Sequence, residues 1–479
     1  MPSIPFPLSS SPGATTSEGA GRLINCYAEP LGADVGVSKG YEPPKVVWRR
    51  SPGLTRFTAD TTAQTGYRGG ILVASTFYAA FSGKVRKFDA DGAESAVGDA
   101  TGTSKGFWAR NNASDPDIVF VDPDQGAFSV SSASVIDFAD ADLPLPLDVT
   151  FIDGYLIFSI GDGRLFATGI NVVTVNALDF AKAETKADGL LRGIAYGGLL
   201  FAFGTQTVEV WSDTANATGF PLTRSTTIPR GLIGRYAVAG HEDGFTKALI
   251  WVAEDNTVVR LNGTTPEKIS PPDLDRAIAS VEDKNTLEAT VYVSGGHSRW
   301  VISSPTFTWE FDLASQKWNE RQSYGISRWR SGQLQYAFGK WIGGDTLSGN
   351  LLYVDDTAYS EDGNPLVMRI ESGPVEKFPN RIQVARADFQ LAPGTGVATG
   401  TDPIQTDPVA QISWSKDGGT NWSNPLLRKI GPQSVTKDRI TVTRCGLSTP
   451  FGHRWRIDVA DPVYVSIMQG NQTASVKAN

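Results

Sequence analysis

The stretch Leu199–Trp211, LLFAFGTQTVEVW, decides the fold, because it contains an apolar strand, a tight turn and a second strand. The same pattern occurs seven times between residues 71 and 369. The other copies begin at Ile71, Asp117, Tyr155, Leu249, Trp300 and Leu351, and the turns lie near Gly83, Gly126, Gly163, Thr205, Asn256, Pro305 and Asp356. Successive turns are 37 to 51 residues apart, and a strand-only repeat of this length is typical of a radial array of small antiparallel sheets. The chain is therefore predicted to be all-β, with a six- or seven-bladed β-propeller.

The composition agrees with an all-β protein that has many turns. The chain has 479 residues, with 50 Gly, 28 Pro and 12 Trp, and this length predicts two or three domains. The net charge of −8 disfavours a dedicated nucleic-acid binder, which usually carries a basic excess. It is compatible with a protein that surrounds DNA without gripping it, because a weakly repulsive wall lets a polyanion slide.

The chain offers little material for a metal or cofactor site. Its two cysteines, Cys26 and Cys445, are far apart, and its three histidines, His241, His297 and His453, are scattered. A disulfide framework, a zinc site and a cofactor site are therefore not expected. The N-terminus lacks the pattern of a signal peptide, and no stretch is apolar for long enough to span a bilayer. We expect synthesis in the cytoplasm and no membrane insertion.

The chain divides into three regions. Residues 1–65 form an irregular, Pro- and Gly-rich lead-in that is expected to cross to another subunit or to close a blade. Residues 66–368 carry the repeats, and one possible helix, Pro272–Ala289, reads as an insertion between blades. Residues 369–479 contain strands at shorter spacing and are predicted to form a C-terminal β-sandwich, with residues 393–408 as an exposed loop.

Two groups of residues invite a functional interpretation. The first matches the Asp-box pattern S-x-D-x-G-x-x-W, and it consists of Ser415, Asp417, Gly419 and Trp422. This pattern indicates a turn, in which Asp417 binds backbone amides and Gly419 adopts a positive φ. Asp-boxes occur in sialidases but away from their catalytic centres, so a single copy outside the propeller carries little catalytic weight.

The second group consists of arginines beside tryptophans. These pairs are Arg49 and Arg50, Arg328 and Arg330, and Arg454 and Arg456. Each pair is interpreted either as a solvated strand face or as a subunit interface, since Arg and Trp are enriched at interfaces.

A longer motif carries a family resemblance. It comprises Asp188, Gly189, Phe203, Gly204, Thr207, Glu209 and Trp211, preceded by Ala187 and followed by Gly231, Gly234 and Tyr236. With the lead-in residues Asn25, Tyr27 and Glu29-Pro30, and the segment Arg454–Ile467, it resembles the packaged-DNA stabilisation proteins of short-tailed bacteriophages.

This resemblance implies a structural virion protein. Such a protein forms a homohexameric ring in the viral tail, as a tail hub, nozzle or head-completion component below the portal and its adaptor ring. It contacts a tail fibre or a distal tail plug or needle, retains packaged double-stranded DNA in the ring lumen without sequence specificity, and forms part of the genome ejection channel. The family implies no catalytic residues and no enzyme activity. Two alternatives stay open: a glycan-cleaving, sialidase-like propeller enzyme, and a receptor- or carbohydrate-binding tail module.

Overall fold

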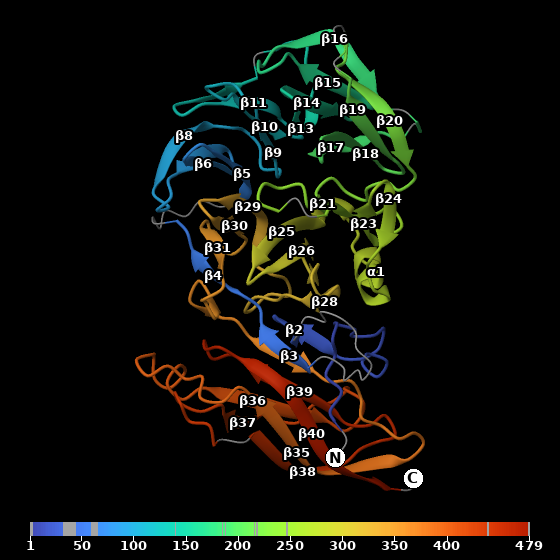
Figure 1. Ribbon diagram of the computed structural model, residues 1–479, viewed down its shortest axis with the longest axis vertical. Helices are drawn as coiled ribbons and strands as arrows, with labels where there is room; N and C mark the ends of the chain where they lie inside the picture. Colours follow the sequence, from blue (N-terminus) through green and yellow to red (C-terminus); the bar gives the residue numbers. More distant parts are fainter. Residues whose placement is uncertain are drawn as a thin grey trace, which may run out of the picture.

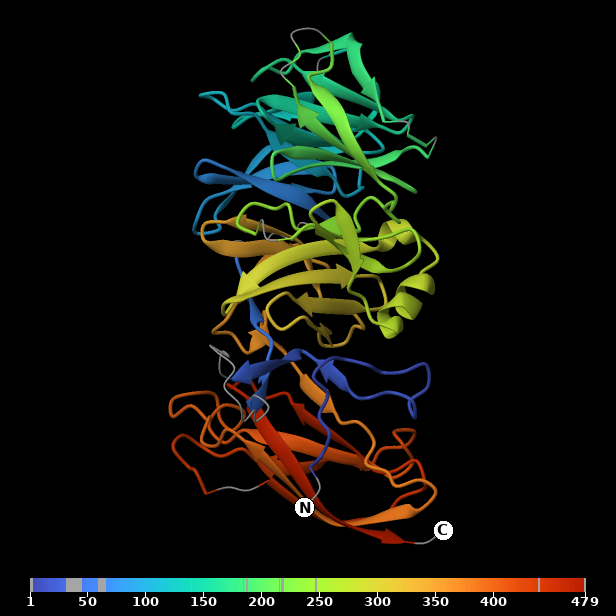
Figure 2. The ribbon, with the colours of Figure 1, turned by 45° about the vertical axis from the view of Figure 1, so that its right-hand side comes forward.

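The computed structural model describes residues 3–477, apart from residues 32–44, 59–65, 139, 184, 187, 215, 217–218, 246–247 and 438–439. The molecule is a column, with the propeller in the upper part of Figure 1 and a β-sandwich below it. The two bodies remain stacked after a 45° turn (Figure 2), and both chain ends lie at the sandwich. The all-β prediction is confirmed: the described residues contain one α-helix, α1 (Pro272–Ala279), and one 3-10 helix, η1 (Lys284–Thr286).

Within the described part of the chain, seven groups of four antiparallel strands form the propeller: five are separate four-stranded sheets, and two are parts of larger sheets. From inner to outer strand, the first four sheets contain β5 (Tyr67–Val73), β6 (Thr76–Phe81), β7 (Lys84–Phe88) and β8 (Glu94–Asp99); β9 (Phe107–Arg110), β10 (Ile118–Asp122), β11 (Gly126–Val130) and β12 (Val135–Asp137); β13 (Pro146–Ile152), β14 (Tyr155–Ile160), β15 (Arg164–Thr168) and β16 (Val175–Lys182); and β17 (Leu190–Tyr196), β18 (Leu199–Gly204), β19 (Val208–Asp213) and β20 (Leu222–Ile228).

The remaining three sheets contain β21 (Val238–Ala239), β22 (Ile250–Val252), β23 (Val258–Asn262) and β24 (Thr265–Lys268); β25 (Glu288–Ser294), β26 (His297–Ser303), β27 (Thr308–Asp312) and β28 (Lys317–Glu320); and β29 (Ser331–Ala337), β30 (Lys340–Asp345), β31 (Leu351–Asp355) and β4 (Gly53–Arg56). The short strands β32 (Ser360–Glu361) and β33 (Asn364–Pro365) extend the last sheet beyond β4.

Burial explains the continuous apolar runs of the repeats. Middle strands such as β6, β14 and β18 are buried at five of six positions, because neighbouring sheets cover both of their faces. The outer strand β20 exposes four consecutive polar residues. Helix α1 lies beside β24, on the flank of the propeller (Figure 1), and buries Leu274 and Ile278. It ends at Ala279, ten residues before the predicted limit.

Six of the seven predicted hairpins form the second and third strands of a sheet, from β6–β7 to β26–β27. The seventh prediction was wrong. Leu351 begins β31, whose hairpin partner is the preceding strand β30, and the chain after Asp356 does not return along β31. The outer strand of this sheet is β4, which pairs antiparallel with β31 from far earlier in the chain. A local repeat pattern contains no signal for such a distant partner.

The lead-in strands complete the sandwich. One of its sheets contains β1 (Arg22–Ile24), β34 (Met368–Glu371), β39 (Arg454–Val459), β36 (Val409–Ser415) and β37 (Leu426–Lys429). The other contains β2 (Cys26–Leu31), β3 (Lys45–Arg50), β40 (Ser466–Lys477), β35 (Arg381–Leu391) and β38 (Ile440–Leu447). The sandwich thus extends beyond residues 369–479, because β1–β3 supply three of its ten strands.

The propeller and the sandwich share one sheet. Strand β1 pairs parallel with β28 and antiparallel with β34, so the sixth propeller sheet continues into the sandwich as a nine-stranded sheet. The N-terminal segment crosses the same junction, where the Ser10 amide donates to the Trp318 carbonyl over 2.7 Å. The Asn25 side chain donates to the carbonyls of Gln322 and Val367 at 2.7 and 2.9 Å. These bonds fix one body on the other.

Candidate functional site

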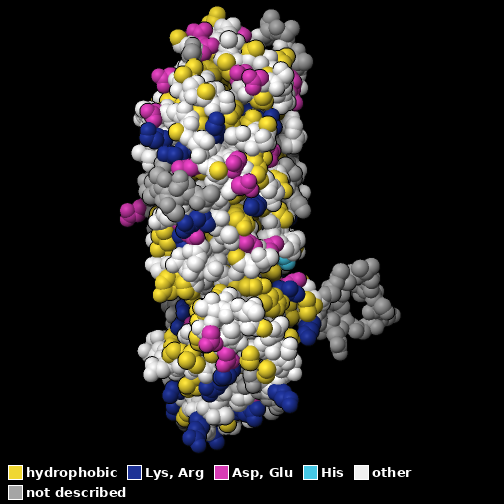
Figure 3. Space-filling model, turned by 90° about the vertical axis from the view of Figure 1, so that its left-hand side faces the viewer, with side chains coloured by type: hydrophobic (Ala, Val, Ile, Leu, Met, Phe, Trp, Pro, Cys, Tyr) yellow, Lys and Arg dark blue, Asp and Glu magenta, His cyan; other side chains and the backbone are white. Residues whose placement is uncertain are grey.

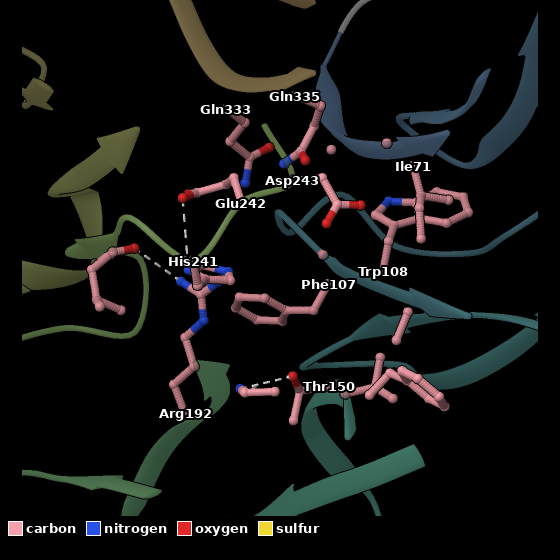
Figure 4. Close-up of a pocket in the computed structure, with 18 of the residues that line it drawn as sticks. Ile71, Phe107, Trp108, Thr150, Arg192, His241, Glu242, Asp243, Gln333 and Gln335 are labelled. Carbon is pink, nitrogen blue, oxygen red and sulfur yellow. Dashed lines mark hydrogen bonds and ion pairs between the residues drawn. The ribbon is translucent and has the colours of Figure 1, made fainter. Parts of the chain in front are cut away.

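The inner strands of all seven sheets meet around one cavity of about 330 Å³ on the propeller axis. Figure 4 shows the side chains that converge on it. They include Trp108, Thr150, Arg192, His241, Asp243 and Gln335. The volume is at the lower end of the range for small-molecule pockets. A double helix, whose major groove alone is about 12 Å wide, cannot pass through it.

Arg192 and His241 form the cationic side of the cavity. The Arg192 guanidinium lies over the Phe107 ring, 4.7 Å from its centroid, and donates to the Val238 carbonyl over 3.3 Å. Its Nη2 atom is 3.3 Å from His241 Nε2. Burial lowers the pKa of His241; the charge of Glu242 opposes this shift, and the charge of Arg192 adds to it. A neutral imidazole whose Nε2 accepts from Arg192 fits this geometry, and it turns Nδ1 toward Glu242, 3.8 Å away.

Three of the acidic and phenolic groups around the cavity, Glu242, Glu288 and Tyr236, are engaged by other parts of the chain, and Asp243 also lines the cavity. Glu242 accepts from the Gly240 amide at 2.6 Å. Burial opposes ionisation of Glu288, but the charges of Lys105 and Arg328 hold its pKa below the ordinary value. The Tyr236 hydroxyl donates to the Lys105 carbonyl over 2.8 Å, and burial raises its pKa to about 12.

Asp148 is the buried carboxyl behind the cavity wall. Burial raises its pKa to about 6, yet it accepts from the amides of Gly193 and Ser159, which hold it in place. A glycosidase needs an acid and a second carboxylate that both face the sugar. Here two of the described groups join neighbouring inner strands: Arg192 of β17 donates to Val238 of β21, and Asp148 of β13 accepts from Gly193 of β17. These hydrogen bonds hold neighbouring sheets together around the cavity.

The family-like motif builds the hairpin of the fourth sheet. The Asp188 carboxylate accepts from the amides of Gln206 and Thr207 at 2.8 and 3.0 Å, which closes the turn between β18 and β19. A Cβ atom on Gly204 would lie 2.7 Å from this carboxylate. The remaining members have structural positions: Gly189 has a φ of +64°, Phe203 and Trp211 are buried in the core, and buried Glu209 accepts from the Thr185 amide at 2.6 Å. Ala187 lies outside the described residues.

The Asp-box residues form a turn in the sandwich. Asp417 accepts from the backbone and side-chain nitrogens of Asn421 at 2.9 and 2.7 Å. Gly419 has a φ of +105°, and its amide donates to the Ser415 hydroxyl over 2.8 Å. The Trp422 ring lies under the Arg456 guanidinium, 3.9 Å from its centroid. Apart from the contact with Arg456 of β39, these contacts are local to the turn, and all of them lie within the sandwich.

Three of the six predicted interface arginines are buried inside one copy. Arg50 donates to the carbonyls of Val459, Asp461 and Val463. Arg330 binds Asp345 through two nitrogens at 2.8 and 2.5 Å. Arg454 donates to the Gly19 carbonyl and so holds the N-terminal segment.

Because Arg50, Arg330 and Arg454 are nearly fully buried, they present little side-chain surface to a second copy. The other three keep some exposure and lie beside acidic partners: Arg49 beside Glu29, Arg328 beside Glu288 and Arg456 beside Glu371. For these three, a subunit contact stays a prediction.

Sequence reasoning did not find the axial cavity. Its residues come from inner strands spread over more than 260 positions, from Gly69 to Gln335. The available signal was the run His241-Glu242-Asp243, three titratable residues directly after a short strand. In the part of the chain that the structure describes, no three His, Cys, Asp or Glu side chains are grouped as metal ligands, and no helix is long and apolar enough to cross a membrane.

The comparisons with known proteins agree with this architecture. A family model described as "Bacteriophage P22 Gp10, beta-propeller" matches residues 23–359, and one described as "Bacteriophage P22 Gp10, beta-sandwich" matches residues 379–471. No curated protein sequence matches the chain.

Two solved structures are similar in outline. The WD40 β-propeller domain of Doa1 is 11% identical with a TM-score of 0.42, covering 63% of this chain and 96% of that one. The computationally designed Ika8 protein is 11% identical with a TM-score of 0.38, covering 74% and 98%. These superpositions are too loose to add to the argument.

The first family model covers more than half of the chain, and the two models together match both bodies of the structure. The chain therefore belongs to the bacteriophage P22 Gp10 family of packaged-DNA stabilisation proteins, and it is a structural protein of the phage virion.

Proposed function

We propose that this protein is a ring-forming tail hub, or nozzle, that lies below the portal and its adaptor ring. Six copies retain the packaged DNA and form part of the ejection channel. The observation that best supports this proposal is the nine-stranded sheet that continues from the propeller into the sandwich. Separate domains usually move relative to each other, but a shared sheet resists bending at the junction.

Stiffness is the mechanical property that such a hub needs. Two sets of hydrogen bonds oppose deformation: those between inner strands around the axial cavity, such as Arg192 to Val238, and those of the N-terminal segment across the junction. A closely packed β-structure has low compressibility and transmits force rather than absorbing it. A ring of these columns therefore withstands pressure from packaged DNA with little change of shape.

The DNA path runs between copies. Because the axial cavity is too small for a duplex, the lumen belongs to the ring and is bounded by the outer surfaces of the columns. A cyclic ring uses a head-to-tail contact, in which two different surfaces of each copy meet. Arg49, Arg328 and Arg456 are candidates for such a contact, and the adaptor, a fibre and the distal plug are the expected further partners.

The proposal is tested with particles assembled without this chain. We expect such particles to package DNA and then lose it, and we expect purified protein to restore retention when it is added before the DNA escapes. Imaging of intact particles should locate six copies below the adaptor. Full DNA content and normal infectivity without the chain would refute the proposal.

The enzyme alternative has a direct test as well. Purified protein is incubated with polysaccharide from the host surface, and released reducing sugar is measured. We expect none above the level of a heat-denatured sample, since Glu288 and Tyr236 are engaged in structural contacts.

A further inference from the structure

The outer face of one sandwich sheet carries an unusual set of side chains. Strands β35 and β40 lie side by side in antiparallel register, so their outward residues form matched rows. The rows are Arg381 with Lys477, Gln383 with Ser475, Arg386 with Thr473, Asp388 with Asn471, and Gln390 with Gln469. Thr441 and Thr443 of β38 extend two rows. Across three strands the face presents amides, hydroxyls, cations and one carboxylate, with the partly exposed Leu447 of β38 opposite Gln383.

The acidic group on this polar face is neutralised within it. Asp388 binds the Arg386 guanidinium at 2.7 and 2.8 Å and accepts from the Thr441 hydroxyl at 2.7 Å. In the neighbouring row, the Gln469 amide donates to the Gln390 carbonyl over 2.8 Å. Arg381 and Lys477 then leave the face with a net positive charge. The face therefore does not repel an anion, and it offers hydrogen-bond donors along its whole length.

The polar face is hollowed at one end. A groove of about 520 Å³ is lined by Gln390, Gln469 and Asn471 together with apolar side chains that include Phe389, Leu391 and Ile440. Pro393 and Thr436 from adjoining loops, and Lys429 at the end of β37, also line it. Lys429 is paired with Asp407 at 2.5 Å, so the groove walls are close to neutral as well.

The charge of the sandwich differs from that of the propeller. Residues 66–368 contain 24 Lys and Arg against 37 Asp and Glu, a net charge of −13, whereas residues 369–479 contain 13 against 9, a net charge of +4. Figure 3 shows the basic side chains gathered at the lower end of the column and acidic side chains spread mostly over the propeller. A polyanion is attracted to the sandwich and repelled by the propeller.

We propose that the polar face of β35, β40 and β38 contacts the phosphate backbone of the double-stranded DNA in the ring lumen. This inference rests on the proposed function and adds which surface lines the channel. Proteins contact phosphates through Arg, Lys, Ser, Thr, Asn and Gln side chains, and such contacts carry no sequence information. A flat sheet face does not enter a groove to read bases. Its amides and hydroxyls are uncharged, so the duplex is held weakly and can slide.

The test uses the fact that both native cysteines, Cys26 and Cys445, are buried. A single exposed cysteine can therefore be labelled selectively with a photoreactive benzophenone. Thr473→Cys places the label in the middle of the polar face. The matched control is Thr226→Cys, an exposed threonine on β20, the outer strand of the fourth propeller sheet. Labelled protein is assembled into DNA-filled particles, which are irradiated before the DNA is recovered.

We expect the label at position 473 to crosslink DNA at least ten times as often as the label at position 226. Equal crosslinking, or crosslinking at position 473 to protein alone, would overturn the assignment of this face. The protein products would reveal a second copy or another tail protein as the true occupant. If particles without the chain leak DNA while the label at 473 misses it, the proposed function stands and only the lumen surface is wrong.

A second measurement follows the movement of the DNA. Thr473→Lys adds one phosphate-binding charge per copy to the polar face, and Thr226→Lys adds the same charge to the propeller. We expect Thr473→Lys to slow ejection several-fold at low salt, with the difference lost near 1 M salt, where the screening length is about 3 Å. Unchanged ejection by Thr473→Lys in particles that retain DNA would contradict the proposal.

Discussion

The propeller and the sandwich are both made of antiparallel sheets, but they obtain their strands in different ways. Six propeller sheets take all four strands from one continuous stretch of chain. Each sandwich sheet combines strands from the lead-in with strands from the C-terminal region. The seventh propeller sheet includes β4, which also comes from the lead-in. Pairing between neighbouring strands builds the successive sheets of the propeller. Pairing between distant strands, near the two chain ends, closes the propeller and joins it to the sandwich. Four experiments test this contrast.

The largest effect is expected from the arginines of β3. Arg50→Ala removes a donor from three carbonyls, of which that of Asp461 keeps its bond from the Val463 amide, and each lost bond costs about 1 kcal/mol or more. We expect the unfolding free energy of the sandwich to fall by roughly 3–5 kcal/mol. Arg49→Ala, at the adjacent and partly exposed position beside Glu29, should cost less than about 1 kcal/mol. Chemical denaturation, with hydrogen exchange to locate the change, measures both.

Similar losses for Arg50→Ala and Arg49→Ala would contradict the view that the lead-in is fastened to the C-terminal strands through Arg50. A loss confined to the propeller would contradict it equally.

The two bodies should respond to pH in opposite directions. Burial lowers the pKa of His453 in the sandwich to about 4. The unfolded state then binds a proton that the folded state does not, so sandwich stability is lost as the pH falls from 6.5 toward 4. Burial raises the pKa of Asp148 in the propeller to about 6. The contribution of Asp148 is greatest below its ordinary pKa, and it is lost as the pH rises through 6.

Each of these pKa shifts corresponds to a change in the free energy of unfolding on the order of 3 kcal/mol. Hydrogen exchange in each body at a series of pH values measures them. Asp148→Asn should flatten the propeller profile and His453→Gln the sandwich profile, each without altering the other. Parallel profiles for the two bodies would show that other groups dominate.

A smaller effect is expected from the two turn aspartates. Asp188→Ala removes the acceptor for the amides of Gln206 and Thr207, and it should cost about 1–2 kcal/mol within the fourth propeller sheet. Asp417→Ala removes the acceptor for Asn421 in the sandwich turn and should cost about 1 kcal/mol. Asn at either position keeps one acceptor and should restore part of the loss. Thermal denaturation ranks the stabilities of the four variants. A loss of stability throughout the propeller from Asp188→Ala would show that the motif does more than close its turn.

The smallest effect is that of salt. Residues 66–368 carry 13 excess negative charges and residues 369–479 four excess positive charges, and self-repulsion destabilises a compact body. Raising the salt concentration from 0.05 to 0.5 M should therefore stabilise the propeller by less than about 1 kcal/mol and the sandwich by still less. Hydrogen exchange in the two bodies detects the difference. A larger gain in the sandwich would contradict the charge argument.

Prediction from the sequence was strongest where pairing is local. The hairpin Leu199–Trp211 and five further copies lie where the pattern places them, because apolar strands separated by a turn pair with their nearest neighbours. The prediction failed at β31, whose outer partner β4 is distant in sequence. The arginine beside a tryptophan was an ambiguous sign, since Arg50 and Arg454 bind carbonyls of distant segments that no local pattern shows.

The sequence by itself determined the all-β class, the repeating hairpins, the two kinds of β-structure and the family, since these depend on residue spacing and on motifs that are continuous in the chain. Only the tertiary structure decided how the ring closes, which strands join the propeller to the sandwich, and which side chains surround the axial cavity or share the polar face. Those features depend on strand pairs that lie hundreds of residues apart, and such pairs are selected by the packing and hydrogen bonding of the whole chain rather than by any local stretch.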